Sequence, residues 1–503
     1  CNIGLGLFHR QNQTTSQQRL SMAKTRPYLY YDHVVTLCEH CLRRIEGKQV
    51  IRDNQVWLHK WCPEHGQSKT LIATDASYWR TAREVYLKPP EMPLRFNTEQ
   101  HWGCPYDCGL CPDHMQHSCL TILEINDHCN LSCPVCYAGS GPQRQKHRSL
   151  ATIESMLDAI VANEGEPDVV QISGGEPTTH PDFFAILDAA KRRPIRHLML
   201  NTNGLRLAQE PEFAQRLASY APGFEVYLQF DSFEKDALLR LRGADLRRVR
   251  MQALENLNRA ELSTTLVMTL ARGINDHEIG KLVEFAATQA CVRGVTLQPI
   301  QFAGRVDGVQ SHSERLTLTG VRQALLDQTP LFEPADIIAV PCNPDALAMG
   351  YAFKTSNGIQ PLTRFVSPET LVGAGRNTIV FESDPALREA VFKLFATNHG
   401  PEAQANCLSD LLCCLPKVQA PANIGYQQVF RVLIMAFMDA TNFDVRAMKK
   451  SCVHIVQEDG RIIPFESFNL LYRDDKREHL ERLRAETDSA FGRKPVINIR
   501  SNA

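Results

Sequence analysis

"LTILEINDHCNLSCPVCYAGSG", residues 120–141, decides the fold of this chain, because a short apolar run leads directly into three closely spaced cysteines. The run at 120–125 is typical of a buried strand. Cys129, Cys133 and Cys136 follow it in a C-x3-C-x2-C arrangement. Three thiolates could bind zinc or a 4Fe-4S cluster, and they are one short of a closed four-ligand site. In a 4Fe-4S cluster they would leave one iron open to a ligand that is not protein.

Strands and helices alternate downstream of the cysteine loop. Further strand-like runs occupy residues 168–173, 197–202, 224–230, 264–269 and 294–300. Helical apolar spacing occurs at residues 149–163, 183–193, 212–221, 247–260 and 278–290. Six strands joined by helices predict an α/β fold with a parallel sheet. Because the crossover connections are right-handed, the sheet is expected to be curved or doubly wound. Ligands are therefore expected at the carboxyl ends of the strands.

A second motif lies one strand further on, in "QISGGEPTTHP" at 171–181. Gly174 and Gly175 would let the backbone approach a ligand closely, and Glu176 offers a carboxylate to an ammonium group. Alone, this stretch could be an ordinary strand-to-helix turn. Its place one β/α unit after an open three-cysteine loop makes it a specific signal for a bound cofactor.

Length and charge limit the classes of function. The 503 residues carry 55 basic and 56 acidic side chains, a formal net charge of −1, so no overall basic field favours nucleic acid. The apolar stretch at 429–440 is too short to span a membrane. Residues 1–21 are expected to be a disordered or non-native lead-in without a secretory signal, which favours the cytoplasm. In that reducing compartment, 17 cysteines favour metal sites over disulfides.

Two further cysteine groups precede residue 120. "GCPYDCGLCPDHMQHSC" contains four cysteines whose x3-x2 spacing favours a 4Fe-4S cluster over zinc: Cys104, Cys108, Cys111 and Cys119. Two knuckle-like pairs separated by a hairpin-length insert form a ribbon-like site of three sulfurs and one nitrogen: Cys38, Cys41, Cys62 and His65. That ligand set favours a structural zinc, and a mononuclear iron is the alternative. Cys291 is expected to be a core residue.

The cysteine loop and the GGEP turn resemble those of the radical S-adenosylmethionine (radical SAM) superfamily. The resemblance implies a partial (β/α)6 barrel and a 4Fe-4S cluster on Cys129, Cys133 and Cys136, with its open iron chelated by S-adenosylmethionine. It also implies that the turn at 174–176 contacts the methionyl amino group. Three more cofactor contacts are implied by "NTNG" and "QFDS" at the ends of later strands: Asn203, Gln229 and Asp231.

Over most of residues 28–475, the sequence is similar to the archaeal tetraether synthase group and its bacterial relatives. This resemblance implies coupling of lipid alkyl chains through an adenosyl radical, with one or two auxiliary 4Fe-4S clusters and one mononuclear zinc or iron. It implies that a C-terminal cluster uses Cys342, Cys414 and Cys452. The family pattern has a cysteine after "IPF", where this chain has Glu466.

These observations predict a lead-in at 1–21, a Cys-rich metal-binding region at 22–119, a radical SAM barrel at 120–305 and a mainly helical region at 306–503. The predicted function is lipid coupling, with a ferredoxin or flavodoxin as electron donor and possible peripheral contact with the inner membrane face. Modification of a small heterocycle such as a pterin is the alternative. A peptide-maturation enzyme and a non-enzymatic zinc-binding interaction protein are the other hypotheses.

Overall fold

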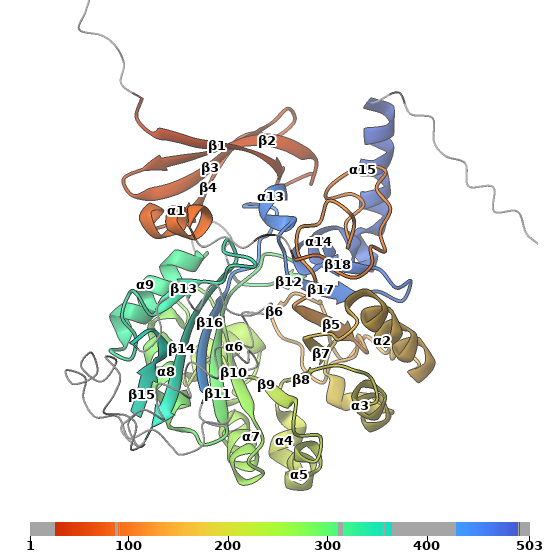
Figure 1. Ribbon diagram of the computed structural model, residues 1–503, viewed down its shortest axis with the longest axis vertical. Coiled ribbons are helices and arrows are strands. Elements are labelled where there is room, and N and C mark those ends of the chain that lie inside the picture. The colour runs from red at the N-terminus through yellow and green to blue at the C-terminus, as the bar shows by residue number, and fades with distance from the viewer. Residues whose placement is uncertain are drawn as a thin grey trace, which may run out of the picture.

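The computed structural model describes residues 26–85, 89, 91–309, 315–355, 358–364, 429–490 and 492. A 12-stranded sheet runs through most of it, in the order β13-β14-β16-β11-β10-β9-β8-β7-β5-β17-β18, with β15 paired to β14. A separate four-stranded sheet stands at one end of the molecule, at the top of Figure 1. The predicted lead-in at 1–21 and the predicted ligand Cys414 lie outside the described residues.

The centre of the large sheet is the predicted run of six parallel strands. These are β5 (Leu120–Glu124), β7 (Val169–Ser173), β8 (His197–Thr202), β9 (Phe224–Gln229), β10 (Thr264–Leu270) and β11 (Val292–Pro299). Each pairs in parallel with the next along the chain, which confirms the partial barrel. Their side chains are almost entirely buried, as expected for a parallel sheet covered on both faces.

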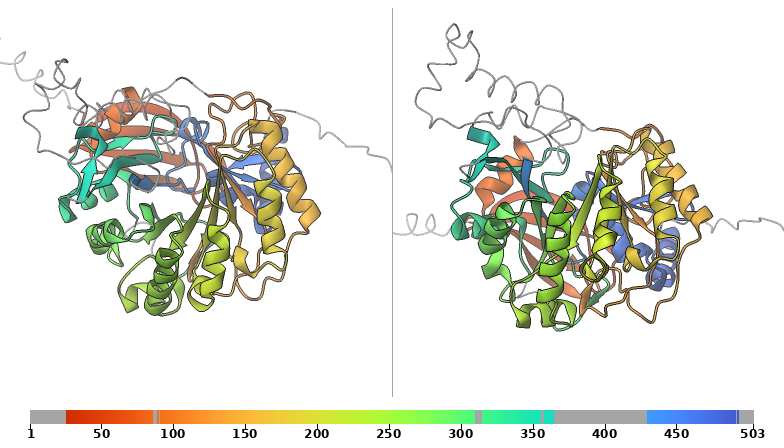
Figure 2. Two further views of the ribbon diagram at one scale, coloured as in Figure 1. Left: turned by 60° about the horizontal axis from the view of Figure 1, so that its bottom comes forward. Right: turned by 90° about the horizontal axis from the view of Figure 1, so that it is seen from below.

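Helices cover the outer side of this curved sheet (Figures 1 and 2). They are α2 (Leu150–Glu164), α3 (Phe183–Lys191), α4 (Leu205–Gln209), α5 (Pro211–Ala218), α6 (Lys235–Arg242), α7 (Arg247–Arg259) and α8 (Ile279–Thr288). Apolar residues spaced along each helix form a buried stripe. Those of α6 belong to a small cluster that includes Val135 of the cysteine loop, and those of the other six helices belong to the largest core cluster. Five of these helices match the predicted ones; α4 and α6 are additional.

The region after residue 306 combines helices with strands that extend the barrel. The helices are α9 (Leu318–Gln328), α13 (Val445–Met448), α14 (Phe465–Ser467) and α15 (Arg477–Ala490), with a π-helical turn, η6 (Phe468–Tyr472). The strands are β13 (Ile337–Ala339), β14 (Leu347–Thr355), β15 (Gly358–Pro361), β16 (Val429–Met435), β17 (Val453–Val456) and β18 (Ile462–Pro464). β16 pairs in parallel with β11 and β17 with β5, so both edges of the barrel are continued by C-terminal segments. No described helix is long and apolar enough to cross a membrane.

The N-terminal sheet is an antiparallel meander followed by one helix. It consists of β1 (Leu29–Leu37), β2 (Arg44–Arg52), β3 (Gln55–Cys62) and β4 (Gly66–Ala73), followed by α1 (Ala76–Glu84). Buried polar contacts fix it to the C-terminal region. The Lys60 ammonium donates to the carbonyls of Leu37 and Ala440 at 3.0 and 2.8 Å, and Arg83 pairs with Asp444 at 3.3 Å.

A buried ion pair joins non-adjacent strands at the amino end of the barrel. Glu225 on β9 is fully buried and lies 2.9 Å from Arg431 on β16, with His197 on β8 at 3.4 Å. Burial opposes ionisation of Glu225, but Arg431 and His197 hold its pKa well below the usual value. This end of a parallel barrel commonly serves stability rather than chemistry.

Replacing Glu225 by glutamine is expected to lower the free energy of unfolding by about 3–5 kcal/mol, because it removes the carboxylate that pairs with buried Arg431. Since the folded-state pKa is depressed, this stabilisation is present above the unfolded-state pKa of about 4.3 and is lost as the pH falls. Chemical denaturation at neutral pH measures the change. The matched control is Glu255→Gln at an exposed i,i+4 pair, where the loss should stay under about 1 kcal/mol. Equal losses in both variants would contradict a stabilising role for the buried pair between Glu225 and Arg431.

Candidate active site and metal centres

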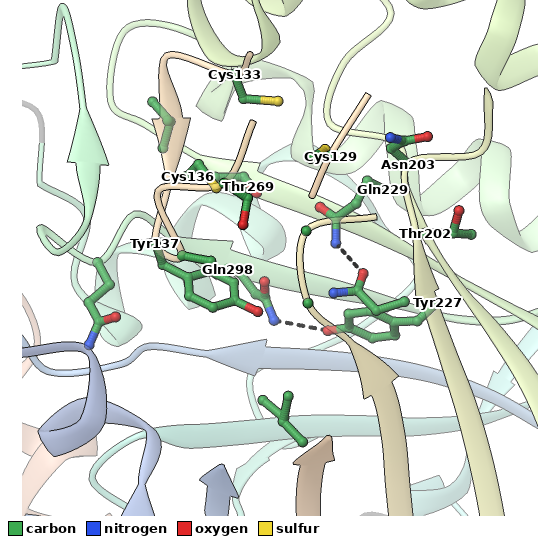
Figure 3. A pocket seen from close by; sticks show the side chains of 18 of the residues that line it. Cys129, Cys133, Cys136, Tyr137, Thr202, Asn203, Tyr227, Gln229, Thr269 and Gln298 are labelled. Atoms are coloured by element: carbon green, nitrogen blue, oxygen red, sulfur yellow. Dashed lines mark hydrogen bonds between the residues drawn. The ribbon is translucent and has the colours of Figure 1, made fainter. Parts of the chain in front are cut away.

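One cavity opens at the carboxyl ends of the barrel strands, where the sequence places the three-cysteine loop. Cys129, Cys133 and Cys136 line it together with the turn at Gly174, Gly175 and Glu176. Figure 3 shows the three cysteines above the ends of the strands, facing polar side chains from β8 to β11. The two motifs that the sequence singled out therefore meet at one site.

The cysteine loop is held in place by contacts with residues 305–306. β6 (Val135–Cys136) pairs with β12 (Arg305–Val306), which fixes the backbone of the third cysteine. Arg305 donates to the carbonyls of Cys133 and Ser140 at 2.6 and 2.7 Å. Burial raises the pKa of Cys129 to about 12 and that of Cys133 above its usual value. Such thiols lose their protons when a metal centre binds.

The GGE turn packs directly onto the cysteine loop. The amides of Gly175 and Glu176 donate to the carbonyls of Asn126 and His128 at 2.9 and 2.8 Å. A Cβ on Gly175 would lie 2.0 Å from the His128 carbonyl oxygen, so no larger residue fits there. Gly174 has a φ of +134°, which also requires glycine. These glycines let the turn pack against the backbone of the cysteine loop, so that both border the same cavity.

The Glu176 carboxylate organises the strand ends. One of its oxygens accepts from the hydroxyls of Thr178 and Thr202 at 2.6 and 2.7 Å, and the other accepts from the Asn203 amide at 2.7 Å. Asn203 also lines the cavity, and its side chain donates to Asn130 in the cysteine loop at 2.7 Å. The carboxylate thus ties the ends of β7 and β8 to the cysteine loop.

A row of polar side chains crosses the ends of the central strands. Asn201 donates to Ser173 at 3.2 Å, Gln229 donates to Asn201 at 3.0 Å, and Arg242 donates to Gln229 at 3.0 Å. Gln298 donates to the Tyr227 hydroxyl at 2.9 Å. The hydrogen bonds donated by the Gln229 and Gln298 side chains are drawn as dashed lines in Figure 3. Asn201 and Gln298 could be identified from the sequence as site residues, because they are polar residues at the carboxyl ends of buried strands.

Asp231 does not line the cavity, unlike the other predicted cofactor contacts. It is fully buried, and its carboxylate accepts from Arg242 at 2.7 and 2.6 Å, with Arg250 at 3.5 Å. Burial opposes its ionisation, but the two arginines hold its pKa below the usual value. Arg242 reaches the cavity instead, and its charge favours the thiolate of Cys133. Arg242 lies on α6, so it could not be identified from the sequence as a polar residue at the end of a strand.

Arg242→Met is expected to lower the free energy of unfolding by about 3 kcal/mol, because it leaves the Asp231 carboxylate buried with a weaker partner. It should also weaken cluster retention, since the cation beside Cys133 is lost. Denaturant unfolding and iron quantitation measure the two effects. Arg247→Met, which breaks an exposed pair with Asp245, is the control and should change both by little. Normal stability in Arg242→Met would contradict the described packing.

The N-terminal sheet carries a compact four-ligand site. The ligand atoms of Cys38, Cys41, Cys62 and His65 all lie within 4.8 Å of one another. The sulfurs of Cys41 and Cys62 are 3.9 Å apart, close to the spacing of about 3.8 Å around a tetrahedral metal with bonds of about 2.3 Å. Burial opposes ionisation of Cys62, but contact with His65 lowers its pKa to about 6. These residues fit a structural zinc.

The structure divides the remaining cysteines differently from the predicted set of four. The sulfurs of Cys119, Cys342 and Cys452 lie within 4.8 Å of one another, and all three residues are buried. Cys119 thus joins two predicted C-terminal ligands rather than the loop of Cys104, Cys108 and Cys111. Sequence spacing missed this because β17, which follows Cys452, pairs with β5, which follows Cys119. Cys291 lies in the barrel core, as predicted.

Comparisons with known proteins agree with this architecture. The model of the radical SAM superfamily matches residues 123–286, and that of the HMPTM N-terminal zinc ribbon domain matches residues 30–74. The 7,8-dihydro-6-hydroxymethylpterin dimethyltransferase of Methanocaldococcus jannaschii is 29% identical over 88% of this chain and 94% of that protein. The mycofactocin maturase MftC of Mycobacterium ulcerans is 31% identical over 34% of this chain and 43% of that protein.

Among solved structures, Streptococcus suis SuiB bound to the precursor peptide SuiA covers 41% of this chain and 44% of that chain, with 16% identity and a TM-score of 0.36. The hypothesis of a non-enzymatic zinc-binding interaction protein is wrong, because the radical SAM model matches the region that contains both motifs of the cavity. The parallel barrel, the three-cysteine loop and the matched family models lead to one conclusion: this is a radical SAM enzyme, with its radical SAM domain at residues 123–286 and a zinc ribbon domain at residues 30–74.

Proposed function

We propose that this enzyme methylates a pterin or a closely related heterocycle. The observation that carries the proposal is the similarity to a pterin dimethyltransferase along 88% of this chain and 94% of that protein. That relative is named as a pterin methyltransferase, so the comparison favours the alternative function over the lipid coupling that the sequence predicted first.

The lining of the cavity supports a flat, polar substrate. Aromatic rings from Tyr137, Tyr227, Phe437 and Phe465 form part of its wall. Amide side chains at the strand ends add donors and acceptors, and the Gln298 oxygen is left for a ligand when its nitrogen donates to Tyr227. A pterin offers a planar ring face and an edge of alternating donors and acceptors. Such a ring can stack on aromatic groups while its edge binds amides.

The cofactors follow from the site and the family. Cys129, Cys133 and Cys136 would hold the 4Fe-4S cluster, and the cofactor contacts that line the cavity would bind S-adenosylmethionine: Gly174, Gly175, Glu176, Asn203 and Gln229. When bound, the cluster and S-adenosylmethionine would supply a 5′-deoxyadenosyl radical that removes hydrogen from an unactivated carbon and leaves as 5′-deoxyadenosine with methionine. A second molecule of S-adenosylmethionine would supply the methyl group and leave as S-adenosylhomocysteine, and the reductant would supply one electron for each of the two molecules. The side chains of this chain orient the substrate and exclude water from the cavity. Two auxiliary iron–sulfur centres are proposed at the other buried cysteine groups, with a ferredoxin or flavodoxin as reductant.

Anaerobic turnover tests the proposed function. The reconstituted enzyme is incubated with S-adenosylmethionine, dithionite and 6-hydroxymethyl-7,8-dihydropterin, and the pterins are analysed by mass spectrometry. The proposal predicts singly or doubly methylated pterin. Gln298→Leu should raise KM for the pterin more than it lowers the yield of deoxyadenosine, whereas Gln145→Leu in the exposed part of the cysteine loop should match the wild type. Deoxyadenosine formed beside unchanged pterin would contradict the proposal.

A further inference from the structure

Glu466 is a buried carboxylate without a full set of partners. It lies on α14 and is fully buried. Its Oε2 accepts from the Ser451 hydroxyl at 2.9 Å, while Oε1 has no hydrogen-bond partner among the described residues. No described lysine, arginine or histidine forms an ion pair with it. An uncompensated buried carboxylate is costly, so its free oxygen points to a missing cation.

The same short helix lies against the cysteine loop at 104–111. The sulfur of Cys108 is 3.3 Å from the hydroxyl of Ser467, the residue after Glu466. The Cys108 amide donates to the Tyr472 hydroxyl at 2.6 Å, so η6 holds this loop as well. Glu466 is therefore the sequence neighbour of a residue that contacts Cys108, which belongs to a group of three cysteines without its predicted fourth member, Cys119.

We propose that Glu466 binds iron through Oε1 and completes an auxiliary centre with Cys104, Cys108 and Cys111. Three thiolates and one carboxylate supply the four protein ligands that a 4Fe-4S cluster takes, one at each iron. This inference rests on the auxiliary centres proposed above, but it does not depend on which substrate the enzyme methylates. The Ser451 hydroxyl orients the carboxylate by holding Oε2.

The placement of Glu466 connects this centre with the active-site cavity. Phe465, the preceding residue, lines that cavity and packs against Tyr137 and Phe437 with ring centroids 5.0 and 4.1 Å apart. The iron bound by Glu466 would thus lie behind the cavity wall. A carboxylate is a harder ligand than a thiolate, so this iron differs chemically from the other three.

Substitution at position 466 tests the inference without turnover. The full chain with Cys129, Cys133 and Cys136 replaced by alanine removes the active-site cluster from the spectra. In this background, Glu466→Gln is expected to lose one iron per chain and to give the EPR signal of a 3Fe-4S cluster. Glu466→Cys should restore the iron content with a four-thiolate cluster. Glu278→Gln, another buried carboxylate, is the matched control and should leave iron and EPR signals unchanged.

A second pair of variants identifies the centre that Glu466 serves, because Glu466 also contacts Ser451, the residue before Cys452. Adding Cys104→Ala and Cys111→Ala should abolish the effect of Glu466→Gln, since the centre itself is then absent. An undiminished effect in that background would assign the carboxylate to the group of Cys119, Cys342 and Cys452 and overturn the inference. No effect of Glu466→Gln in either background would overturn it as well.

Spectroscopy on chains that keep Glu466 avoids any dependence on the folding of its variants. The same triple-alanine protein is prepared with 13C-labelled glutamate carboxylates and reduced, and 13C ENDOR is recorded on the cluster signal. Direct ligation predicts a strongly coupled carboxylate carbon that disappears in labelled Glu466→Cys. A spectrum with no coupled carbon would contradict ligation by Glu466.

Discussion

Replacing Cys133 by alanine is expected to abolish the reductive cleavage of S-adenosylmethionine, with deoxyadenosine formation falling to the level without enzyme. Cys133 lies in the middle of the three-cysteine loop and lines the cavity, so its loss leaves two thiolates for a cluster that needs three. Anaerobic reconstitution followed by chromatography of deoxyadenosine measures the change. Iron and sulfide quantitation should show the loss of one cluster per chain.

Cys291→Ala is the matched control for this variant. Cys291 is also a buried cysteine, but it packs in the barrel core and belongs to none of the cysteine groups assigned to metal centres. Its truncation should cost about 1–2 kcal/mol of stability and leave cleavage activity intact. Activity retained in Cys133→Ala, or lost equally in both variants, would contradict the assignment of the loop as the cluster site.

Removing the ribbon metal is expected to unfold the N-terminal sheet while the barrel stays folded. Structural zinc contributes about 10–16 kcal/mol of binding free energy to a small domain, more than the short strands β1–β4 could supply alone. Cys62→Ser breaks the four-ligand set, so we expect loss of zinc and fast amide hydrogen exchange across residues 30–74. Elemental analysis and hydrogen-exchange mass spectrometry measure both.

Two histidines of the ribbon provide a matched pair for this prediction. His65→Asn removes a ligand and should reduce zinc content, whereas His59→Asn changes a β3 residue outside the ligand set and should not. The iron content of the barrel should stay the same in all these variants. Normal zinc content in Cys62→Ser would refute the ribbon site, and simultaneous loss of iron would show that the ribbon is needed for the barrel to fold.

The barrel could be predicted from the sequence because its signals are local. Six apolar runs alternate with helical spacing, and each run appears as a strand within two residues of the expected bounds. The C-terminal strands escaped prediction for the opposite reason. β16 and β17 join the barrel only through pairing with β11 and β5, which lie far away in the chain. A uniformly apolar run such as 429–435 does not distinguish a strand from a buried helix.

The candidate site, too, could be predicted from the sequence only where its signals are local. The spacing of Cys129, Cys133 and Cys136 and the GGE turn could be read directly, because each motif lies within one loop. The role of Asp231 could not, because its neighbours Arg242 and Arg250 come from later helices and turn its carboxylate away from the cavity. The grouping of Cys119 with distant cysteines depended in the same way on tertiary pairing.

One competition experiment tests the central claim most directly. The reconstituted enzyme is given S-adenosylmethionine and dithionite in a single anaerobic mixture of 6-hydroxymethyl-7,8-dihydropterin and a membrane lipid extract, with Cys133→Ala as the blank. Mass spectrometry follows both substrates. The account predicts methylated pterin and unchanged lipids with the wild-type chain and neither product with the variant. Coupled lipid chains beside unmodified pterin would contradict it.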